Sequence, residues 1–165
     1  MRASVLLPLS VRANLTLARL GELCRRGFLR PEAERAAARA LSSRLGVKCA
    51  SLEQPVGQLS GGNQQKVVLG RWLDREFDVL LCDEPTRGVD VAARAEIHEL
   101  LRELAGAGKA VLVVSSEIEE LRALCDRIVV LSGGSVAATF TREGFDQDAI
   151  LVAALRDHAG GKGAA

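Results

Sequence analysis

Two short segments of the sequence combine residues whose types and spacing suit phosphate chemistry. The first, residues 59–65, has the sequence Leu-Ser-Gly-Gly-Asn-Gln-Gln. Two consecutive glycines weaken a helix start by about 1 kcal/mol each relative to alanine, but they let backbone N–H groups approach an anion closely. Ser60 adds a hydroxyl group beside the positive end of the helix that follows. Taken alone, this segment is better explained as an ordinary serine cap after a glycine turn.

The second segment, residues 79–86, has the sequence Val-Leu-Leu-Cys-Asp-Glu-Pro-Thr. Its apolar run predicts a strand that is buried on both faces and ends in two carboxylates. In a parallel sheet these carboxylates lie at the carboxyl edge, where such folds bind ligands. Asp83 would hold Mg²⁺, commonly through water, and Glu84 would polarise a water for attack on a γ-phosphate. The alternative is a solvated turn, because strands that end in acidic residues are not rare.

The elements that must position these segments follow from apolar spacing, caps and breakers. Ser10, Ser60 and Asp90 each cap an expected helix, and Pro31 opens another. The expected elements are helices at 11–17, 31–45, 61–73, 91–105, 117–124 and 146–156, and strands at 79–82, 110–114, 128–131 and 135–140. The alternation of strands and helices after residue 77 predicts an α/β fold with right-handed crossovers and a parallel sheet.

Composition narrows the class of protein. The chain has 165 residues, of which 48% are hydrophobic and 26% charged, a balance typical of a globular domain. A net charge of +1 predicts no basic surface for nucleic acid. The four cysteines form no C-x-x-C pair and have no histidine at metal-ligand spacing, which favours reduced, intracellular thiols. The longest apolar run, Ala149–Leu155, is too short to span a membrane, so we expect a soluble, cytoplasmic chain.

Together, the two segments resemble the motifs of ATP-binding cassette ATPases, in which signature motif, signature helix, Walker B strand and D-loop follow in this order. Residues 59–66, Leu-Ser-Gly-Gly-Asn-Gln-Gln-Lys, and residues 83–90, Asp-Glu-Pro-Thr-Arg-Gly-Val-Asp, are similar to one branch, the tandem cassettes of ribose, xylose and galactoside importers. Residues 115–117 resemble that branch's second, C-terminal cassette, and residues 10–17 resemble the entrance to its helical subdomain. The resemblance covers nearly the whole chain. It implies a partial P-loop NTPase core, α/β in class, with a helical signature subdomain.

The resemblance also implies cofactors and roles. In this family two cassettes sandwich ATP head to tail, so ATP and Mg²⁺ are the implied cofactors. Ser60, Gly61 and Gly62 would cap, in trans, the γ-phosphate that a partner cassette binds. Asp83 would serve a cis site as the Mg²⁺ ligand, and Glu84 would serve it as the catalytic carboxylate. The other implied site residues are Asn63 and Gln64 in the signature, Asp90 at the dimer seam, and Ser116 where many cassettes place a switch histidine.

The family's phosphate loop, G-x-x-x-x-G-K-[ST], is absent from the 165 residues. The Gly-Lys pairs at 108–109 and 161–162 are followed by Ala110 and Gly163 rather than by Ser or Thr. We therefore expect a sheet that lacks its phosphate-loop strand and a chain that does not hydrolyse ATP alone. The gap would leave unpaired backbone groups and apolar side chains beside the strands at 110–114 and 128–131. This predicts aggregation or reliance on a partner.

We expect residues 1–76 to form the helical signature subdomain, residues 77–158 the later part of the ATPase core, and residues 159–165 a flexible tail. The expected function is that of a fragment of a sugar-importer ATPase that contributes to a composite ATP site. Its partners would be another cassette, in tandem or on a separate chain, and the transporter's membrane subunits, at the inner face of the cell membrane. The alternatives are a non-catalytic remnant or interaction module from a truncated gene, and a non-transport cassette of repair or translation.

Two further side chains have simple structural interpretations. Trp72 lies among apolar residues at helical spacing and is expected to pack in the core. His98 is expected on the solvated side of the helix at 91–105.

Overall fold

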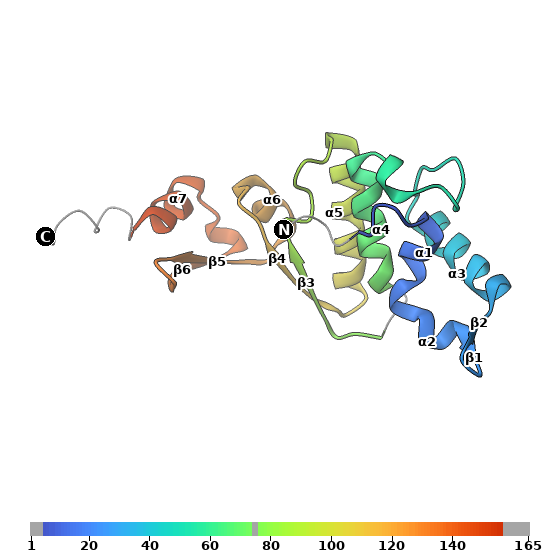
Figure 1. The fold of residues 1–165 in the computed structure, drawn as a ribbon. Coiled ribbons are helices and arrows are strands. Elements are labelled where there is room, and N and C mark those ends of the chain that lie inside the picture. The colour runs from blue at the N-terminus through green and yellow to red at the C-terminus, as the bar shows by residue number, and fades with distance from the viewer. Residues whose placement is uncertain (1–4, 74–75, 157–165) are drawn as a thin grey trace, which may run out of the picture. The chain divides into compact units, whose positions relative to one another are not determined.

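The computed structural model describes residues 5–73 and 76–156. The chain divides into two compact units, Met1–Leu112 and Val113–Ala165, and each has its own set of packed elements (Figure 1). The sequence suggested a division after residue 76, between a signature subdomain and an ATPase core. That division stays a prediction. The expected flexible tail, 159–165, lies outside the described residues.

Helices dominate the first part of unit 1. The elements are α1 (Val11–Thr16), α2 (Leu20–Leu23), β1 (Cys24–Arg25), β2 (Phe28–Leu29), α3 (Pro31–Arg44) and α4 (Gly61–Leu73), with short 3-10 helices at Leu17–Arg19 and Val56–Gln58. α1 packs against both α3 and α4 (Figure 1). At Gly70 of α4 a Cβ atom would lie 2.4 Å from Leu45 Cδ1 and 2.8 Å from Leu15 Cδ2. A larger residue at position 70 would therefore displace the ends of these two leucine side chains.

The predicted cap at Ser10 and the predicted proline start at Pro31 are present. Ser10 Oγ accepts a hydrogen bond from the amide of Ala13 at 3.1 Å, which fixes the start of α1. Pro31 occupies the first turn of α3. The β1–β2 hairpin was not predicted, because two-residue strands carry no periodic signal. Its turn uses Arg26 and Gly27, with φ angles of 53° and 83°.

The second part of unit 1 is built around a strand pair and its crossover helix. β3 (Val79–Asp83) and β4 (Ala110–Val114) are neighbours in one sheet and are joined through α5 (Val91–Gly106). The amide of Ala110 donates to the carbonyl of Asp78 at 2.9 Å, so the two strands begin side by side, as in a parallel pair. The buried stripe of α5 consists of Ile97, His98, Leu100, Leu101 and Leu104.

The expectation that these strands are buried on both faces is wrong for this chain. Cys82 is buried, but Val79 is 57% exposed, Leu81 71% and Leu112 57%. The alternation places these three exposed side chains on one face of the sheet. A continuous apolar run marks a strand that can be covered on both faces, and the described residues cover only one.

Unit 2 contains α6 (Ile118–Leu124), β5 (Arg127–Ser132), β6 (Ser135–Thr141), a short 3-10 helix (Arg142–Gly144) and α7 (Gln147–Leu155). β5 and β6 form the predicted antiparallel hairpin, and its turn residues Gly133 and Gly134 have φ angles of 55° and 81°. Ile128, Val130 and Ile150 form a small core between the hairpin and α7.

The described strands form three separate two-stranded sheets, β1–β2, β3–β4 and β5–β6. β4 and β5 are thus in different sheets within the part of the chain that the structure describes. The α/β class agrees with the expectation, and the absence of a phosphate-loop strand from the sheet stays a prediction.

Two side chains lie differently from the prediction. Trp72 is 47% exposed, because the neighbouring Arg71 takes the buried position on α4. His98 is only 8% exposed, because the buried stripe of α5 is wide enough to include it.

Candidate functional site

The signature segment forms the start of α4 and is held by its own side chains. The amide of Gln64 donates to the carbonyl of Ser60 at 2.9 Å, so Ser60 occupies the cap position. Asn63 Nδ2 donates to Ser60 Oγ at 2.8 Å, and Asn63 Oδ1 accepts from the amide of Lys48 at 2.7 Å. Gln64 Nε2 donates to the carbonyl of Leu59 at 2.9 Å. Ser60 itself stays exposed, while the amides of Asn63 and Gln64 shape the loop around it.

The two signature glycines lie in different surroundings, which favour glycine at the two positions for different reasons. Gly61 is exposed, and a Cβ atom there would lie 3.3 Å from the carbonyl oxygen of Gly88. Gly62 is buried, and its Cβ would lie 2.4 Å from the Cβ of Ala93 and 3.3 Å from Val89 Cγ1. From the sequence, the two glycines were expected either to let an anion approach or to form the turn before the Ser60 cap. The structure gives Gly62 another reason, which is the close packing of α4 on the start of α5.

The loop before α5 lies beside the signature glycines. Asp90 caps α5, since its Oδ1 accepts from the amide of Ala93 at 2.9 Å. Its Oδ2 lies 3.8 Å from the position that a Cβ atom would have at Gly62. The fold therefore brings Asp90 next to Gly62, although 27 residues lie between them in the sequence.

The two adjacent carboxylates stand at the end of β3, as the sequence predicted. Asp83 is exposed, and Glu84 is partly buried with a φ angle of 50°. A residue other than glycine in this left-handed region costs about 1–2 kcal/mol, and such strain is common at functional sites. Thr86 is fully buried and anchors the turn, since its carbonyl accepts from the amide of Val89 at 3.1 Å.

Within residues 5–73 and 76–156, no group of three or more His, Cys, Asp and Glu side chains is arranged to bind a metal. Mg²⁺ in nucleotide sites is bound by one or two carboxylates together with phosphate oxygens and water. The exposed Asp83 carboxylate fits that limited role.

Ser116 belongs to unit 2, where it is exposed in the turn between β4 and α6. Next to it, Ser115 Oγ accepts from the amide of Glu117 at 3.1 Å. The grouping of Ser116 with the carboxylates of unit 1 stays a prediction. Lys109, which follows Gly108, packs with its ammonium 5.5 Å from the centre of the Phe77 ring.

Two buried basic residues position α4, and sequence analysis missed both. Lys66 is 4% exposed, donates from Nζ to the carbonyl of Gly46 at 3.1 Å, and forms an ion pair with Glu96 of α5. Arg71 donates from Nε to the carbonyl of Asn14 at 2.9 Å and from Nη2 to Asn14 Oδ1 at 2.6 Å. Burial lowers the pKa of Arg71. The sequence did offer one signal for their burial, since Lys66 and Arg71 flank the apolar residues Val67 and Leu69 on the same helix.

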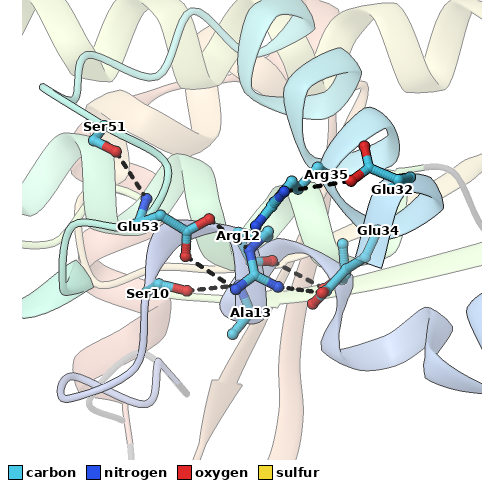
Figure 2. A network of polar contacts seen from close by, with 9 residues as sticks. Ser10, Arg12, Ala13, Glu32, Glu34, Arg35, Ser51 and Glu53 are labelled. Atoms are coloured by element: carbon cyan, nitrogen blue, oxygen red, sulfur yellow. Dashed lines mark hydrogen bonds and ion pairs between the residues drawn. The ribbon is translucent and has the colours of Figure 1, made fainter. Parts of the chain in front are cut away.

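A third network fixes the scaffold that leads to the signature (Figure 2). Arg12 of α1 forms an ion pair with Glu34 of α3. It also forms a bidentate ion pair with Glu53, in which the Nε–Oε1 and Nη2–Oε2 distances are both 2.9 Å. The hydrogen bonds with Glu53 raise the pKa of Arg12, and those with Arg12 lower the pKa of Glu53. The buried Glu34 also accepts from Thr16 Oγ1 at 3.1 Å. α1, α3 and the loop at residue 53 are thereby tied together.

Comparison with known proteins identifies the family. The model of the ABC transporter family matches residues 4–87, which is just over half of the chain. The chain belongs to the ABC transporter family. This membership accounts for the presence of a signature segment, a strand ending in two carboxylates and a loop ending in Asp90 in one short chain.

Several curated relatives have similar sequences. The arabinose import ATP-binding protein AraG of Rhizobium etli is 46% identical over 90% of this chain. The ribose import ATP-binding proteins named RbsA 2 of Streptomyces coelicolor and Rubrobacter xylanophilus are 45% and 48% identical over 94% and 89% of it. The chain spans only 28–30% of the length of these relatives.

Solved structures share the fold. The dimeric, post-hydrolysis ATP-binding cassette MJ0796, bound to ADP and Pi, matches with a TM-score of 0.73 and 28% identity, over 88% of this chain and 62% of that one. A metal-chelate type ABC transporter in an inward-facing conformation has a TM-score of 0.74 over 93% of this chain and 61% of its own, but its 19% identity supports the fold alone. None of the helices in the described residues is long and apolar enough to cross a membrane.

Proposed function

We propose that this chain supplies the signature half of a composite ATP site in a sugar-importing ABC transporter. The observation that carries the proposal is the exposed Ser60 at the start of α4, packed through Gly62 beside Asp90. The names of the relatives, which are import ATP-binding proteins for arabinose and ribose, support the substrate class. The dimeric cassette with bound ADP and Pi supports a site formed between two cassettes.

The signature half acts on the phosphate through hydrogen-bond donors. The N–H groups in the first turn of a helix have no partner within the helix, and the helix dipole gives that end partial positive charge. Asn63 Nδ2 donates to Ser60 Oγ, so the oxygen accepts one bond while its own hydrogen is free to turn toward a ligand. Ser60 and the first turn of α4 are thus suited to a γ-phosphate that another cassette holds.

The carboxylates at the end of β3 serve a different nucleotide in this proposal. Asp83 would supply a carboxylate ligand to the Mg²⁺ of a bound nucleotide, and Glu84 would accept a proton from the attacking water. A phosphate loop is needed to complete this second site, and the 165 residues contain none. Ser116 would orient groups near the γ-phosphate once the two units are assembled. Turnover at this site therefore requires further cassette residues.

The proposed partners follow from the same arrangement. A second cassette supplies the phosphate loop that faces Ser60, and the membrane subunits of the transporter hold the assembly at the inner face of the cell membrane. Matched cassettes are longer, since this chain covers about 62% of one of them. The exposed apolar side chains Val79, Leu81 and Leu112 supply the surface on which further cassette residues would pack.

The test uses a cassette that has an intact phosphate loop but a disabled signature serine. Adding this chain should raise its ATP turnover, because Ser60 and α4 complete the site. Ser60→Arg should abolish the increase in ATP turnover, since the arginine side chain is much larger than serine and fills the space that the phosphate needs. Ser43→Arg, on an exposed serine of α3, is the matched control and should leave the increase intact. Absence of stimulation at saturating chain would refute the proposal.

A second candidate is a non-catalytic remnant or interaction module. The observation that favours it is the exposed apolar face of β3 and β4, which suits a chain that depends on a partner for solubility. A chain of this kind would bind a partner cassette without changing its turnover. The same mixing experiment therefore separates the two candidates.

A further inference from the structure

Lys66 occupies an unusual place for a lysine. Only 5% of its side chain is exposed, and its ammonium group joins three parts of unit 1. It lies on α4, donates to the carbonyl of Gly46 just after α3 at 3.1 Å, and pairs with Glu96 on α5. A buried ammonium group is costly unless it is paired and hydrogen-bonded. Both conditions are met here, so this lysine has a defined position rather than a solvated one.

The contacts of Lys66 lie one helical turn from those of Gly62. On α4, Gly62 packs against Ala93 of α5, and four residues later Lys66 pairs with Glu96. Residues three and four apart lie on the same helix face. The backbone contact and the ion pair therefore run along one seam between α4 and α5. Together they fix both the distance between the two helices and their sliding along each other.

The two parts of the candidate site lie on the two helices that meet at this seam. Ser60 stands at the start of α4, and Asp90 caps the start of α5. A shift of α4 along α5 would move Ser60 relative to Asp90 by the same amount. Displacements of about 1 Å are enough to cost on the order of a hundredfold in rate when a group must meet a reacting centre.

We propose that Lys66 is a positioning residue for the composite ATP site: by joining α4 to Glu96 and to the Gly46 carbonyl, it sets where the signature serine stands relative to Asp90. This inference rests on the proposed function, because it assigns Lys66 a part in phosphate capping by α4. Lys66 itself is buried and does not touch the nucleotide. Its effect acts through the placement of Ser60.

The test measures how this chain stimulates a cassette with an intact phosphate loop. Lys66→Gln should lower the turnover reached at saturating chain by at least about tenfold. Lys66→Arg, which keeps the charge and the donors, should recover most of it. Glu99→Gln is the matched control, since Glu99 lies on α5 like Glu96 but forms only an exposed i,i+3 pair with Arg102, and it should behave as the wild type.

A purely stabilising role gives a different result. It would reduce the amount of folded chain, which raises the concentration needed for half-maximal stimulation but leaves the saturated turnover unchanged. That outcome for Lys66→Gln would overturn the inference. Glu96→Gln, which keeps an acceptor for the lysine, should lose less than Lys66→Gln. It serves as the second variant if Lys66→Gln does not fold.

A second readout does not depend on turnover. Hydrogen exchange at residues 61–66 and 91–96 should become faster in Lys66→Gln and stay unchanged in Glu99→Gln. Equal exchange in Lys66→Gln and wild type would contradict the inference even if turnover changes. If the wild-type chain gives no stimulation, the proposed function fails, and the exchange experiment still decides whether Lys66 holds the seam.

Discussion

Gly62→Ala tests the close packing of the signature helix most sharply. The added Cβ would lie 2.4 Å from the Cβ of Ala93, whereas carbon atoms in contact are about 3.5–4.0 Å apart. α4 and α5 must therefore separate by about 1 Å. Overpacking of this kind costs about 1–3 kcal/mol, and the better helix propensity of alanine returns at most about 1 kcal/mol. We expect a net loss of about 1–2 kcal/mol in the free energy of unfolding.

Urea unfolding followed by tryptophan fluorescence measures this loss. Trp72 is the sole tryptophan of the sequence and lies on α4, so it reports on the helix that is perturbed. With a slope of about 2 kcal/mol per molar urea, the midpoint should fall by about 0.5–1 M. Gly106→Ala is the control, because no atom lies within 4 Å of a Cβ there, and its midpoint should not fall.

A double substitution identifies the cause of the loss. Ala93→Gly removes the atom that the new methyl group meets, so adding it to Gly62→Ala should restore at least half of the lost stability. Such coupling between neighbours is expected to be about 1 kcal/mol. A midpoint for Gly62→Ala equal to that of Gly106→Ala, or an additive double variant, would refute the packing argument.

Three further predictions concern side chains around the site. Arg71→Met should lower the free energy of unfolding by about 1–3 kcal/mol, because the buried oxygens of Asn14 lose their hydrogen-bond donor. Arg35→Met is the control in the same urea assay: it breaks an exposed ion pair of 3.4 Å with Glu32 and should cost less than about 1 kcal/mol. Glu84→Gly should raise the urea midpoint, since it relieves a φ angle of 50°. The hydrogen bond from Lys66 lowers the pKa of Glu96 below 4.5, so this pair stabilises the fold above pH 4.5 and is lost as the pH falls further. Glu96→Gln should therefore flatten the acid limb of a pH–stability curve.

Local signals predicted the boundaries of most elements. Serine and aspartate side chains before apolar stripes fixed the starts of α1 and α5, because a cap is a property of a few adjacent residues. The glycine pair at 133–134 fixed the β5–β6 hairpin for the same reason. The position of Asp83 and Glu84 at the end of β3 followed from the apolar run before them.

Contacts between distant segments were not accessible from the sequence. The Gly62–Ala93 contact, the Lys66–Glu96 pair and the Arg71–Asn14 hydrogen bonds each join separate elements. Periodicity indicates that a helix has a buried face, but it does not say which helix covers that face. The sequence therefore offered only anion approach or a glycine turn as reasons for Gly62, and not its packing against Ala93.

The exposed face of β3 and β4 shows a second limit. An apolar run such as 79–82 indicates that a strand can be covered on both faces, but it does not indicate whether the covering residues belong to the same chain. Leu81 is 71% exposed in this structure, although its type and position predicted burial. The sequence therefore predicted the strand correctly and its surroundings incorrectly.

We propose that α4 of this chain completes an ATP site whose phosphate loop lies on another cassette. The decisive experiment titrates the chain into a cassette with an intact phosphate loop and a disabled signature, while phosphate release is measured at saturating ATP. We expect phosphate release to rise and to saturate at one chain per cassette, and Ser60→Arg to give no rise. A flat titration with the wild-type chain, or an equal rise with Ser60→Arg, would contradict it.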